Sequence, residues 1–263
     1  MRNAITSTCG FLAILFIGVL FMVRAPLFAK GSPSTGWSLI WSDEFDDAKL
    51  NTRRWVIADR TRPNYDGGVN YYDPREVSVE YGNLVIQSHP QAVGRDGKPT
   101  YSSGRVSTQG KFAFLYGKLE IRARLPGSQG LWPAMWMLPA DKSWPPEVDL
   151  LELTGSDPTR IYMTHHWGTR RQDLHHTTDF AGPDFTRDFH VFSIEWEPGK
   201  IRWLIDDIER KVETAHVPNK AMYLILNTSV GGDWAGLPDE TSVFPANMQV
   251  DYVRVFQHPK KRR

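Results

Sequence analysis

After its N-terminal stretch the sequence has no cysteine. The single cysteine of the chain, Cys9, stands before the apolar run that begins at Phe11. The remainder of the chain can therefore form no disulfide framework and offers no thiol for nucleophilic or metal chemistry. Cys9 also lies on the wrong side of the apolar run for a lipid-attachment cysteine. The fold has to be stabilised by packing.

The chain also lacks an excess of charge of either sign. It has 31 Lys and Arg against 30 Asp and Glu, a formal net charge of +1. This balance gives no electrostatic attraction to nucleic acid or to an anionic membrane, so a neutral partner is expected. The basic residues from Lys260 to Arg263 follow the last apolar segment, and residues 259–263 are predicted to be a solvated tail.

A membrane span of ordinary length is missing as well. The longest apolar run, Phe11 to Val23, has 13 residues, whereas a span needs about 20. Arg2 precedes the run and the small residue Ala29 follows it, which is the pattern of a secretory signal peptide. We predict that residues 1–29 direct secretion to the extracellular or periplasmic space. Because the cleavage site is not a clean small-x-small pattern, an uncleaved membrane anchor is the alternative.

Helical periodicity is absent from the rest of the chain. Short runs of β-branched and aromatic residues alternate with Gly and Pro, which predicts strands. In residues 119–125 apolar and charged side chains alternate, as in a strand with one buried face. Pro198 and Gly199 lie between two such runs and predict a hairpin. Residues 30–258 are expected to form one all-β domain, a sandwich of two antiparallel sheets.

Polar segments and aromatic residues indicate a groove. Residues 59–75 and 168–188 are rich in Gly, Pro and Asp and have no strand pattern, which favours rim loops beside a site. The chain has 10 Trp, 9 Tyr and 13 Phe, and flat aromatic faces suit sugar rings. About half of the tryptophans, such as Trp41, are expected in the core. Five tryptophans beside Gly, Pro or clustered charge are predicted to line the groove: Trp132, Trp136, Trp144, Trp167 and Trp234.

Three carboxylates, Glu147, Asp149 and Glu152, lie within six residues among apolar neighbours. In a strand Glu147 and Asp149 share a face, whereas Glu152 points the other way. One extra residue at Leu150 or Leu151, a β-bulge, would return Glu152 to the common face. Two carboxyl groups about 5 to 5.5 Å apart suit retaining glycoside hydrolysis, one as nucleophile and one as proton donor. Asp149 would hold the nucleophile and raise the pKa of the acid.

The same segment also fits a short amphipathic helix. Ser143 suits an N-cap, Pro145 and Pro146 suit a first turn, and Gly155 suits a helix end. The local pattern does not separate the two interpretations. Only the strand-rich surroundings favour the strand.

With these residues the sequence resembles glycoside hydrolase family 16, whose active-site strand reads E-x-D-x-E or, in a bulged branch, E-x-D-x-x-E. Glu147 to Glu152 has the bulged form. The Trp-Pro-Pro before Glu147 departs from the small residue usual in laminarinases, which leaves the polysaccharide open. From about Trp41 to Phe256, further blocks resemble laminarinase-type members in family order: SDEF, YYDPREVSVEYGNLVIQS, YSSGRVSTQGKFAFLYGKLEIRARLP, GLWPAMWMLP, FHVFSIEWEPGKIRWLIDD, LNTSVGGDW and VDYVRV.

The resemblance implies a β-jelly-roll with a concave cleft. It implies Glu147 as nucleophile, Asp149 as its assistant and Glu152 as general acid and base, with no cofactor for catalysis. The residues implied along the sugar subsites are Arg105, Trp132, Trp136, His166, Trp167 and Asn227, to which the groove pattern adds Trp234.

The resemblance also implies a structural calcium ion on the convex side, held at Glu44, Gly82 and Asp251. Oxygen ligands suit this ion. The alternative is that Asp251 only ends a strand.

Two further patterns need weighing. The histidines at 165, 166, 175 and 176 lack the ligand spacing of a zinc motif, and the catalytic interpretation needs no zinc. Asn227 begins an Asn-Thr-Ser sequon, but its place in an apolar strand argues against glycosylation and favours contact with sugar.

The sequence therefore predicts a secreted, monomeric, endo-acting retaining hydrolase. Its expected substrate is a β-1,3 or β-1,3/1,4 glucan or a related bacterial exopolysaccharide. The alternatives are a non-catalytic carbohydrate-binding protein and a transglycosylase of the same fold. The three carboxylates favour an enzyme, since a binding protein gains nothing from them. No stable membrane partner is expected unless the N-terminal segment is uncleaved.

Overall fold

The computed structural model describes residues 36–62, 67–94, 97 and 100–259. The predicted signal segment, residues 1–29, lies outside the described residues, as does Lys30. Of the predicted basic tail, only residue 259 is described. Within the described part, no helix is long and apolar enough to cross a membrane. Residues 36–263 form a unit distinct from residues 1–35, and the description below concerns that unit.

Almost all regular structure in the described residues is β-strand, as the sequence predicts. The one exception is a single 3₁₀ turn at Pro74–Glu76 (η1). The strands are β1 (Ser38–Asp43), β2 (Val56–Ile57), β3 (Asn70–Tyr72), β4 (Val77–Glu80), β5 (Asn83–Gln91), β6 (Thr100–Ser103), β7 (Arg105–Ser107), β8 (Gly117–Arg124), β9 (Leu131–Pro139), β10 (Glu147–Glu152), β11 (Arg160–Thr169), β12 (Gln172–Ala181), β13 (His190–Glu197), β14 (Lys200–Ile205), β15 (Ile208–Glu213), β16 (Met222–Val230) and β17 (Ala246–Gln257).

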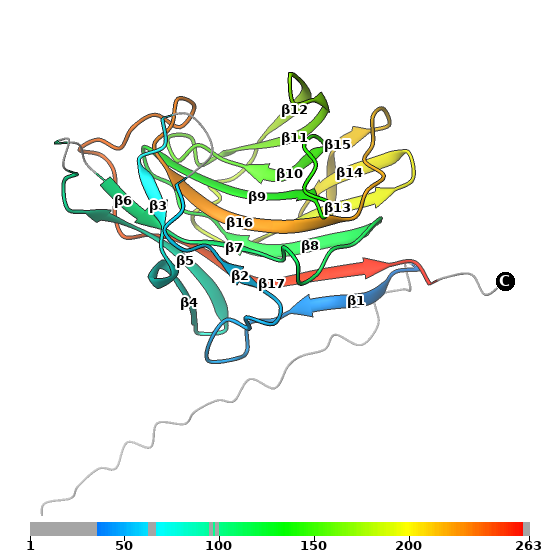
Figure 1. Cartoon of the computed structure of the whole chain (residues 1–263), viewed down its shortest axis with the longest axis horizontal. Helices are drawn as coiled ribbons and strands as arrows, with labels where there is room; N and C mark the ends of the chain where they lie inside the picture. The colour runs from blue at the N-terminus through cyan, green and yellow to red at the C-terminus, as the bar shows by residue number, and fades with distance from the viewer. Residues whose placement is uncertain (1–35, 63–66, 95–96, 98–99, 260–263) are drawn as a thin grey trace, which may run out of the picture. The chain divides into compact units, whose positions relative to one another are not determined.

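The strands form two sheets that stack face to face (Figure 1). The first sheet has the order β15-β14-β13-β8-β17-β5-β6-β3, with β1 paired to β17 and β4 paired to β5. The second has the order β12-β11-β10-β9-β16-β7-β2. Among the described strands, only β3 and β6 pair in parallel. Some strands that are far apart in the sequence, such as β8 and β17 or β9 and β16, lie side by side, so the predicted antiparallel sandwich is confirmed as a jelly-roll.

The hydrophobic core lies between the two sheets. The alternation predicted for residues 119–125 is present, because buried and partly buried residues alternate along β8. Trp55, Trp196 and Trp203 are completely buried, so a share of the tryptophans does belong to the core. The predicted hairpin joins β13 to β14 through Pro198 and Gly199. Strand period and turn chemistry therefore predict this part of the fold well.

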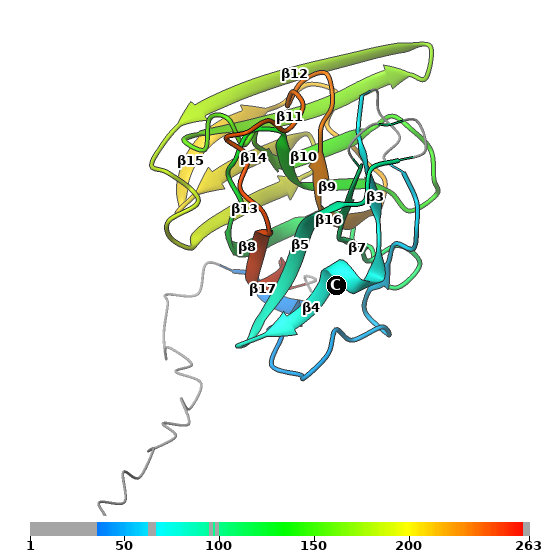
Figure 2. The same cartoon turned by 90° about the vertical axis from the view of Figure 1, so that its left-hand side faces the viewer.

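The two segments predicted as rim loops contain regular structure. Residues 59–75 include β3 and part of η1. Residues 168–188 include all of β12, which pairs with β11 over ten residues at one edge of the second sheet (Figure 2). The loop prediction for 172–181 is wrong because β12 is an edge strand with mostly exposed side chains on both faces. An exposed edge strand does not need the alternation that marks a strand with one buried face.

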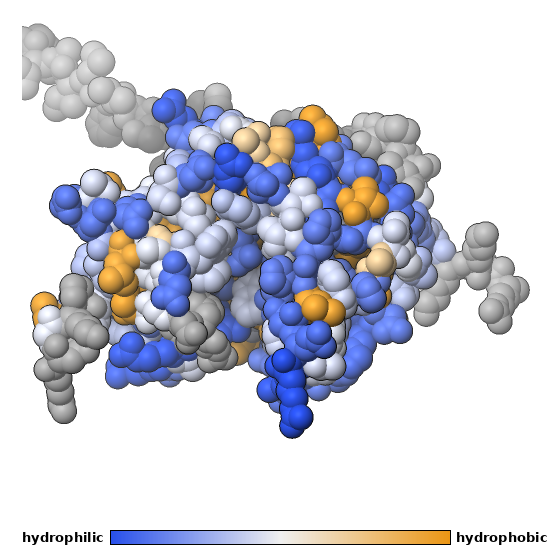
Figure 3. Space-filling model, turned by 90° about the horizontal axis from the view of Figure 1, so that it is seen from above, coloured by the Kyte–Doolittle hydropathy of each residue, from blue (hydrophilic) through white to orange (hydrophobic). Residues whose placement is uncertain are grey.

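Seen from above, the surface is mostly polar, with apolar residues in separate small patches (Figure 3). Isolated apolar residues are normal on a monomeric protein, whereas a docking face would join them into a larger patch. The face in view therefore presents no large apolar docking surface.

Candidate active site

Strand β10 contains the bulge that the carboxylate spacing requires. Against β9, Asp149 pairs with Trp136 and Leu151 pairs with Met135, so Leu150 is the extra residue. Against β11 the register also shifts between Asp149 and Glu152. The helix alternative for this segment is therefore wrong, and the predicted bulge is confirmed. Leu150 and Leu151 both point into the core, which leaves Glu152 on the same face as Asp149.

The three carboxylates line one cavity of about 270 Å³ on the second sheet. Ligand-type atoms of Glu147, Asp149 and His166 lie within 4.8 Å of one another. His166 is placed opposite Glu147 by the pairing of β10 with β11. The cavity is lined by Trp132, Ala134, Trp136, Glu147, Asp149, Glu152, His166 and Asn227.

Each glutamate accepts a hydrogen bond from a tryptophan. The indole Nε1 of Trp144 donates to Oε2 of Glu147 over 2.7 Å, and that of Trp132 donates to Oε1 of Glu152 over 2.9 Å. A bond to a carboxylate is stronger than one between neutral groups. The two indoles therefore fix the orientation of both carboxyl groups and stabilise their charged forms.

Burial dominates the acid–base behaviour of the triad. It raises the pKa of Glu147 to about 8, and the charge of Asp149 adds to the shift. It raises the pKa of Glu152 to about 7, with the charge of Glu147 as the second cause. The pKa of Asp149 is also raised well above its ordinary value, first by burial and then by the charge of Glu152. The charges of the three groups oppose one another, so their protonation is linked, which permits one to act as a carboxylate while another donates a proton.

One side of the cavity is a polar and aromatic surface built by β7, β9 and β16. Asn227 accepts a hydrogen bond of 2.8 Å from Nε1 of Trp136. The guanidinium of Arg105 lies 5.5 Å from the ring centre of Trp136 and 5.7 Å from that of Tyr72. Asn227 is only 3% exposed and bonded on both sides, which argues against glycosylation of its sequon.

The predicted groove tryptophans divide between two locations. Trp234 is 41% exposed and its ring meets the edges of Trp132 and Tyr162 at 4.9 Å, so it stands at the rim beside Glu152. Trp167 does not reach the cleft. Side chains alternate along β11, so Trp167 lies on the opposite face from His166, and it stacks on His216 at 4.9 Å.

The first sheet supports strand β10 from behind. The indole Nε1 of Trp203 on β14 donates to the main-chain oxygen of Asp149 over 2.9 Å. Nζ of Lys211 lies 4.8 Å from the ring centre of Trp203 and donates to the main-chain oxygens of Met163 and His176. These contacts tie β10, β11 and β12 to the opposite sheet.

The four histidines that sequence reasoning grouped are divided by the sheet. His165 is buried on the core side, where burial lowers its pKa to about 4. His176 pairs with Glu213. His166 and His175 lie opposite each other on the cleft side of β11 and β12. The four therefore form no single metal cluster, although ligand atoms of His166 and His175 converge with one of Asp173.

The residues implied for calcium lie close together in the first sheet, but their side chains are engaged in other contacts. β17 pairs with β5 up to Val250 and with β1 from Val253, so Asp251 lies near both the β4–β5 turn at Gly82 and Glu44. However, Glu44 accepts two hydrogen bonds from Arg254, and Asp251 accepts one from Arg122. As they lie, these carboxylates fit ion pairs rather than an oxygen cage for Ca²⁺.

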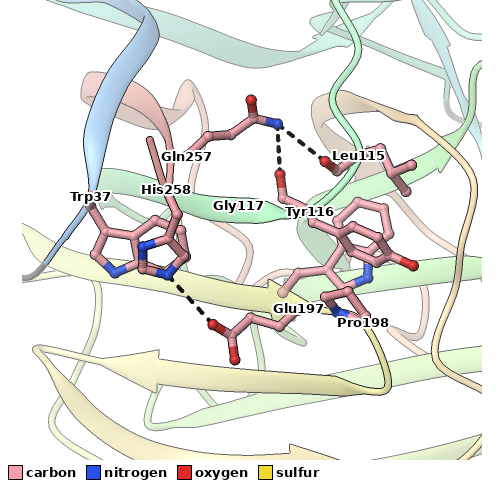
Figure 4. Close-up of a pocket in the computed structure, with 9 residues that line it drawn as sticks. Trp37, Leu115, Tyr116, Gly117, Glu197, Pro198, Gln257 and His258 are labelled. Atoms are coloured by element: carbon pink, nitrogen blue, oxygen red, sulfur yellow. Dashed lines mark hydrogen bonds and ion pairs between the residues drawn. The ribbon is translucent and has the colours of Figure 1, made fainter. Parts of the chain in front are cut away.

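A second, larger cavity of about 450 Å³ lies where the end of β17 meets the β13–β14 hairpin (Figure 4). Its walls include Trp37, Tyr116 and His258. Glu197 is its one lining carboxylate and lies 3.5 Å from Nε2 of His258. Its lining therefore lacks the pair of carboxyl groups that glycoside hydrolysis typically uses. The smaller cavity is therefore the candidate active site.

Sequence reasoning missed several residues of this site. Tyr162 stands opposite Glu152 in the pairing of β11 with β10. Asp173 on β12 lies 3.1 Å from Nδ1 of His166, and Trp203 contacts Asp149 from the other sheet. None could be found locally, because each contact depends on strand register or on packing across the core.

Comparison with known proteins agrees with this geometry. Residues 69–254 match the model of the family described as glycosyl hydrolases family 16. The chain is 35% identical to a beta-glucanase of Rhodothermus marinus, over 84% of this chain and 85% of that protein. It is 33% identical to glucan endo-1,3-beta-glucosidase A1 of Niallia circulans, over 84% of this chain but only 38% of that longer protein.

Solved structures give the same picture. The catalytic domain of an endo-1,3-beta-glucanase (laminarinase) from Thermotoga petrophila superimposes with a TM-score of 0.76 at 34% identity. The match covers 85% of this chain and 99% of that one. The endo-beta-1,3-glucanase from Pyrococcus furiosus gives a TM-score of 0.75 at 34% identity, over 86% of this chain and 96% of that one.

Proposed function

The chain belongs to glycosyl hydrolase family 16 and is an O-glycoside hydrolase of the endo-β-glucanase type, and from this premise we propose which residues carry its chemistry. Glu147 is the nucleophile, Glu152 is the general acid and base, and Asp149 assists between them. The observation that carries the assignment is the bulge at Leu150, which brings all three carboxylates into one cavity.

In the first step, the carboxylate of Glu147 attacks the anomeric carbon while Glu152 gives its proton to the leaving oxygen. In the second, Glu152 takes a proton from water, which cleaves the glycosyl-enzyme and restores the β-configuration. The pKa values of Glu147 and Glu152 are both raised, first by burial. Substrate binding therefore has to leave a proton on Glu152. Positive charge that develops at the anomeric carbon favours the anion of Glu147 beside it.

The proposed substrate is a β-1,3 or β-1,3/1,4 glucan or a related bacterial exopolysaccharide. The names of several relatives support this range, among them endo-1,3-1,4-beta-glycanase ExsH of Rhizobium meliloti, 33% identical over 84% of this chain. Trp132, Trp136 and Trp234 are proposed to bind sugar rings, with Arg105, His166 and Asn227 contacting hydroxyl groups. Trp167 is not part of this proposal because it faces away from the cleft.

A purely carbohydrate-binding protein is the second candidate. One relative, the beta-1,3-glucan-binding protein of Penaeus monodon, is 29% identical over 52% of this chain. One buried and two partly buried carboxylates with two indole donors favour catalysis, since withdrawal of such groups from water is costly in a site that only binds. A transglycosylase would use the same first step and resolve the intermediate with a sugar hydroxyl.

Incubation with laminarin, lichenan, agarose, carrageenan and a succinoglycan-type polymer, followed by sizing of the products, tests the function. We expect internal cleavage of a β-1,3 or mixed glucan, and no cleavage by Glu147→Gln. Binding of these glucans without cleavage by the unsubstituted protein would favour the binding protein. Products longer than the substrate would favour transfer over hydrolysis.

Secretion through residues 1–29, a monomeric state and a structural calcium ion at Glu44, Gly82 and Asp251 complete the proposal. The strand registers favour the calcium site, whereas the pairing of both carboxylates with arginine opposes it. Calcium binding would require Arg254 and Arg122 to release them.

A further inference from the structure

Three metal-ligand side chains share one face of the β11–β12 hairpin. His166 and His175 pair directly across the two strands, and Asp173 lies two residues before His175, on the same face. Nδ1 of His166 is 3.1 Å from Oδ2 of Asp173, and Nδ1 of His175 is 3.7 Å from the same oxygen. All three ligand atoms lie within 4.8 Å of one another.

These separations suit a tetrahedral metal ion. Zn²⁺ binds imidazole nitrogen and carboxylate oxygen at about 2.0 to 2.2 Å, which puts neighbouring ligand atoms roughly 3.4 Å apart. The separations of 3.1 and 3.7 Å between the two Nδ1 atoms and Oδ2 of Asp173 lie on either side of that value. Two histidines and one carboxylate fill three positions and leave the fourth to water, as in open zinc sites. A hairpin also holds the ligands in fixed register.

A second observation comes from the catalytic side. Oδ2 of Asp149 is buried and accepts no hydrogen bond of normal geometry among the described residues, although Nε2 of His166 is only 3.3 Å away. A metal ion on Nδ1 fixes the ring proton on Nε2, directed at that oxygen. Metal-bound histidines usually donate their other N–H to a carboxylate. Asp149 therefore has the position of the carboxylate that accepts this hydrogen bond in metal sites.

We propose that His166, Asp173 and His175 form a site for a divalent transition-metal ion of the zinc class at the rim of the cleft, and that its occupancy inhibits hydrolysis. Inhibition rests on the proposed function, because His166 lines the substrate cavity. A bound ion holds His166 toward β12 and occupies the rim with its own water. A sugar hydroxyl then loses the contact with His166.

The hairpin supplies a matched pair of variants. His175 is exposed, and its contacts are with Asp173 and the ring of His166. His176, the next residue, is equally exposed and pairs instead with Glu213 on the other face. Replacement of either residue removes one exposed histidine from the same edge strand, but only His175→Ala removes a proposed ligand.

Metal binding should be measured directly, by titrating metal-free protein with Zn²⁺ against a chromophoric chelator and with Co²⁺ by visible absorption. The parent and His176→Ala should bind one equivalent and show a tetrahedral Co²⁺ spectrum. His175→Ala should bind at least about 10-fold more weakly, since loss of even an outer partner has that effect. Zn²⁺ should inhibit the parent and His176→Ala but not His175→Ala, whose activity without metal should be unchanged.

Equal binding by His175→Ala and the parent would overturn the site, as would no binding by the parent at millimolar Zn²⁺. Zn²⁺ inhibition that persists in His175→Ala would put the ion on Glu147, Asp149 and His166, the other group whose ligand atoms converge. Zn²⁺ binding by the parent without inhibition of its hydrolysis would overturn the proposal that the bound ion inhibits the enzyme. The titration does not depend on turnover, so it tests the site even if the proposed function fails.

Discussion

The indole Nε1 of Trp203 donates a 2.9 Å hydrogen bond to the main-chain oxygen of Asp149, from the opposite sheet. Asp149 is the residue before the bulge at Leu150, where the hydrogen-bond ladder of β10 shifts. A buried carbonyl without a partner is costly, so this indole stabilises the bulge and with it the placement of Glu152. The core thus takes part in positioning the residues proposed to be catalytic.

Replacement of Trp203 by Phe should lower kcat although the protein still folds. The lost bond is worth about 1 to 1.5 kcal/mol, and a tenfold rate change needs about 1.4 kcal/mol. We expect kcat to fall roughly tenfold. The matched control is Trp196→Phe, because Trp196 is equally buried and donates to the main-chain oxygen of Pro218 over 3.0 Å. Equal kcat values in two variants of similar melting temperature would show that Trp203 has no positioning role.

The hydrogen bond from Trp144 to Glu147 should matter in the first chemical step. Hydrogen bonds to charged groups contribute about 1.5 to 3 kcal/mol, so Trp144→Phe should slow formation of the glycosyl-enzyme at least about tenfold. Burst kinetics with an activated aryl glycoside measure that step. Trp37→Phe, outside the cleft, should leave the burst unchanged. A normal burst in Trp144→Phe would mean that the indole does not assist the nucleophile.

The raised pKa of Glu147 has a consequence for stability. Its value of about 8 in the folded protein compares with about 4.3 in an unfolded chain. The folded state keeps a proton that the unfolded state loses. The stabilisation from this group is therefore complete below about pH 4 and is lost as the pH rises toward 8.

Glu147→Gln removes this ionisation and should be more stable than the parent in alkali. Its melting temperature should exceed that of the parent by about 2 °C or more at pH 8.5, and the gap should shrink toward pH 5. Exposed Glu240→Gln is the control and should show no such trend. A gap that is independent of pH would argue against a strongly raised pKa at Glu147.

Calcium should raise the melting temperature if the proposed site forms, because a ligand that binds only the folded state stabilises it. Excess chelator should lower the melting temperature while the catalytic residues stay in place. Asp251→Asn should abolish the response to calcium. An unchanged melting curve in excess chelator, with the metal content shown to be nil, would leave Glu44 and Asp251 as partners of arginine alone.

The sequence predicts the sandwich and the bulge because both follow from local rules. Apolar and charged residues alternate along β8, and the odd spacing of Glu147 and Glu152 requires an extra residue. The proposed sugar-contact residues follow from the resemblance to the family. The placement of Trp167 in the groove is wrong, because strand alternation turns its side chain away from that of His166.

The parts that sequence could not predict depend on register and on packing between sheets. The sequence does not predict β12, because apolar and polar residues need not alternate along an exposed edge strand. Without β12, the contact of Asp173 with His166 cannot be predicted either. Trp203 and Asp149 lie 54 residues apart in sequence and meet only across the core. Neither relationship leaves a local pattern.

The stereochemistry of the product and of azide-rescued variants tests the central claim most directly. Proton NMR should find the β-anomer as the first-formed sugar of the unsubstituted enzyme. With Glu152→Ala and an activated substrate, azide should resolve the intermediate to a β-glycosyl azide. With Glu147→Ala, azide can attack only the opposite face and should give the α-azide. An α-anomer from the unsubstituted enzyme would contradict retention, and a β-azide from Glu147→Ala would exclude Glu147 as the nucleophile.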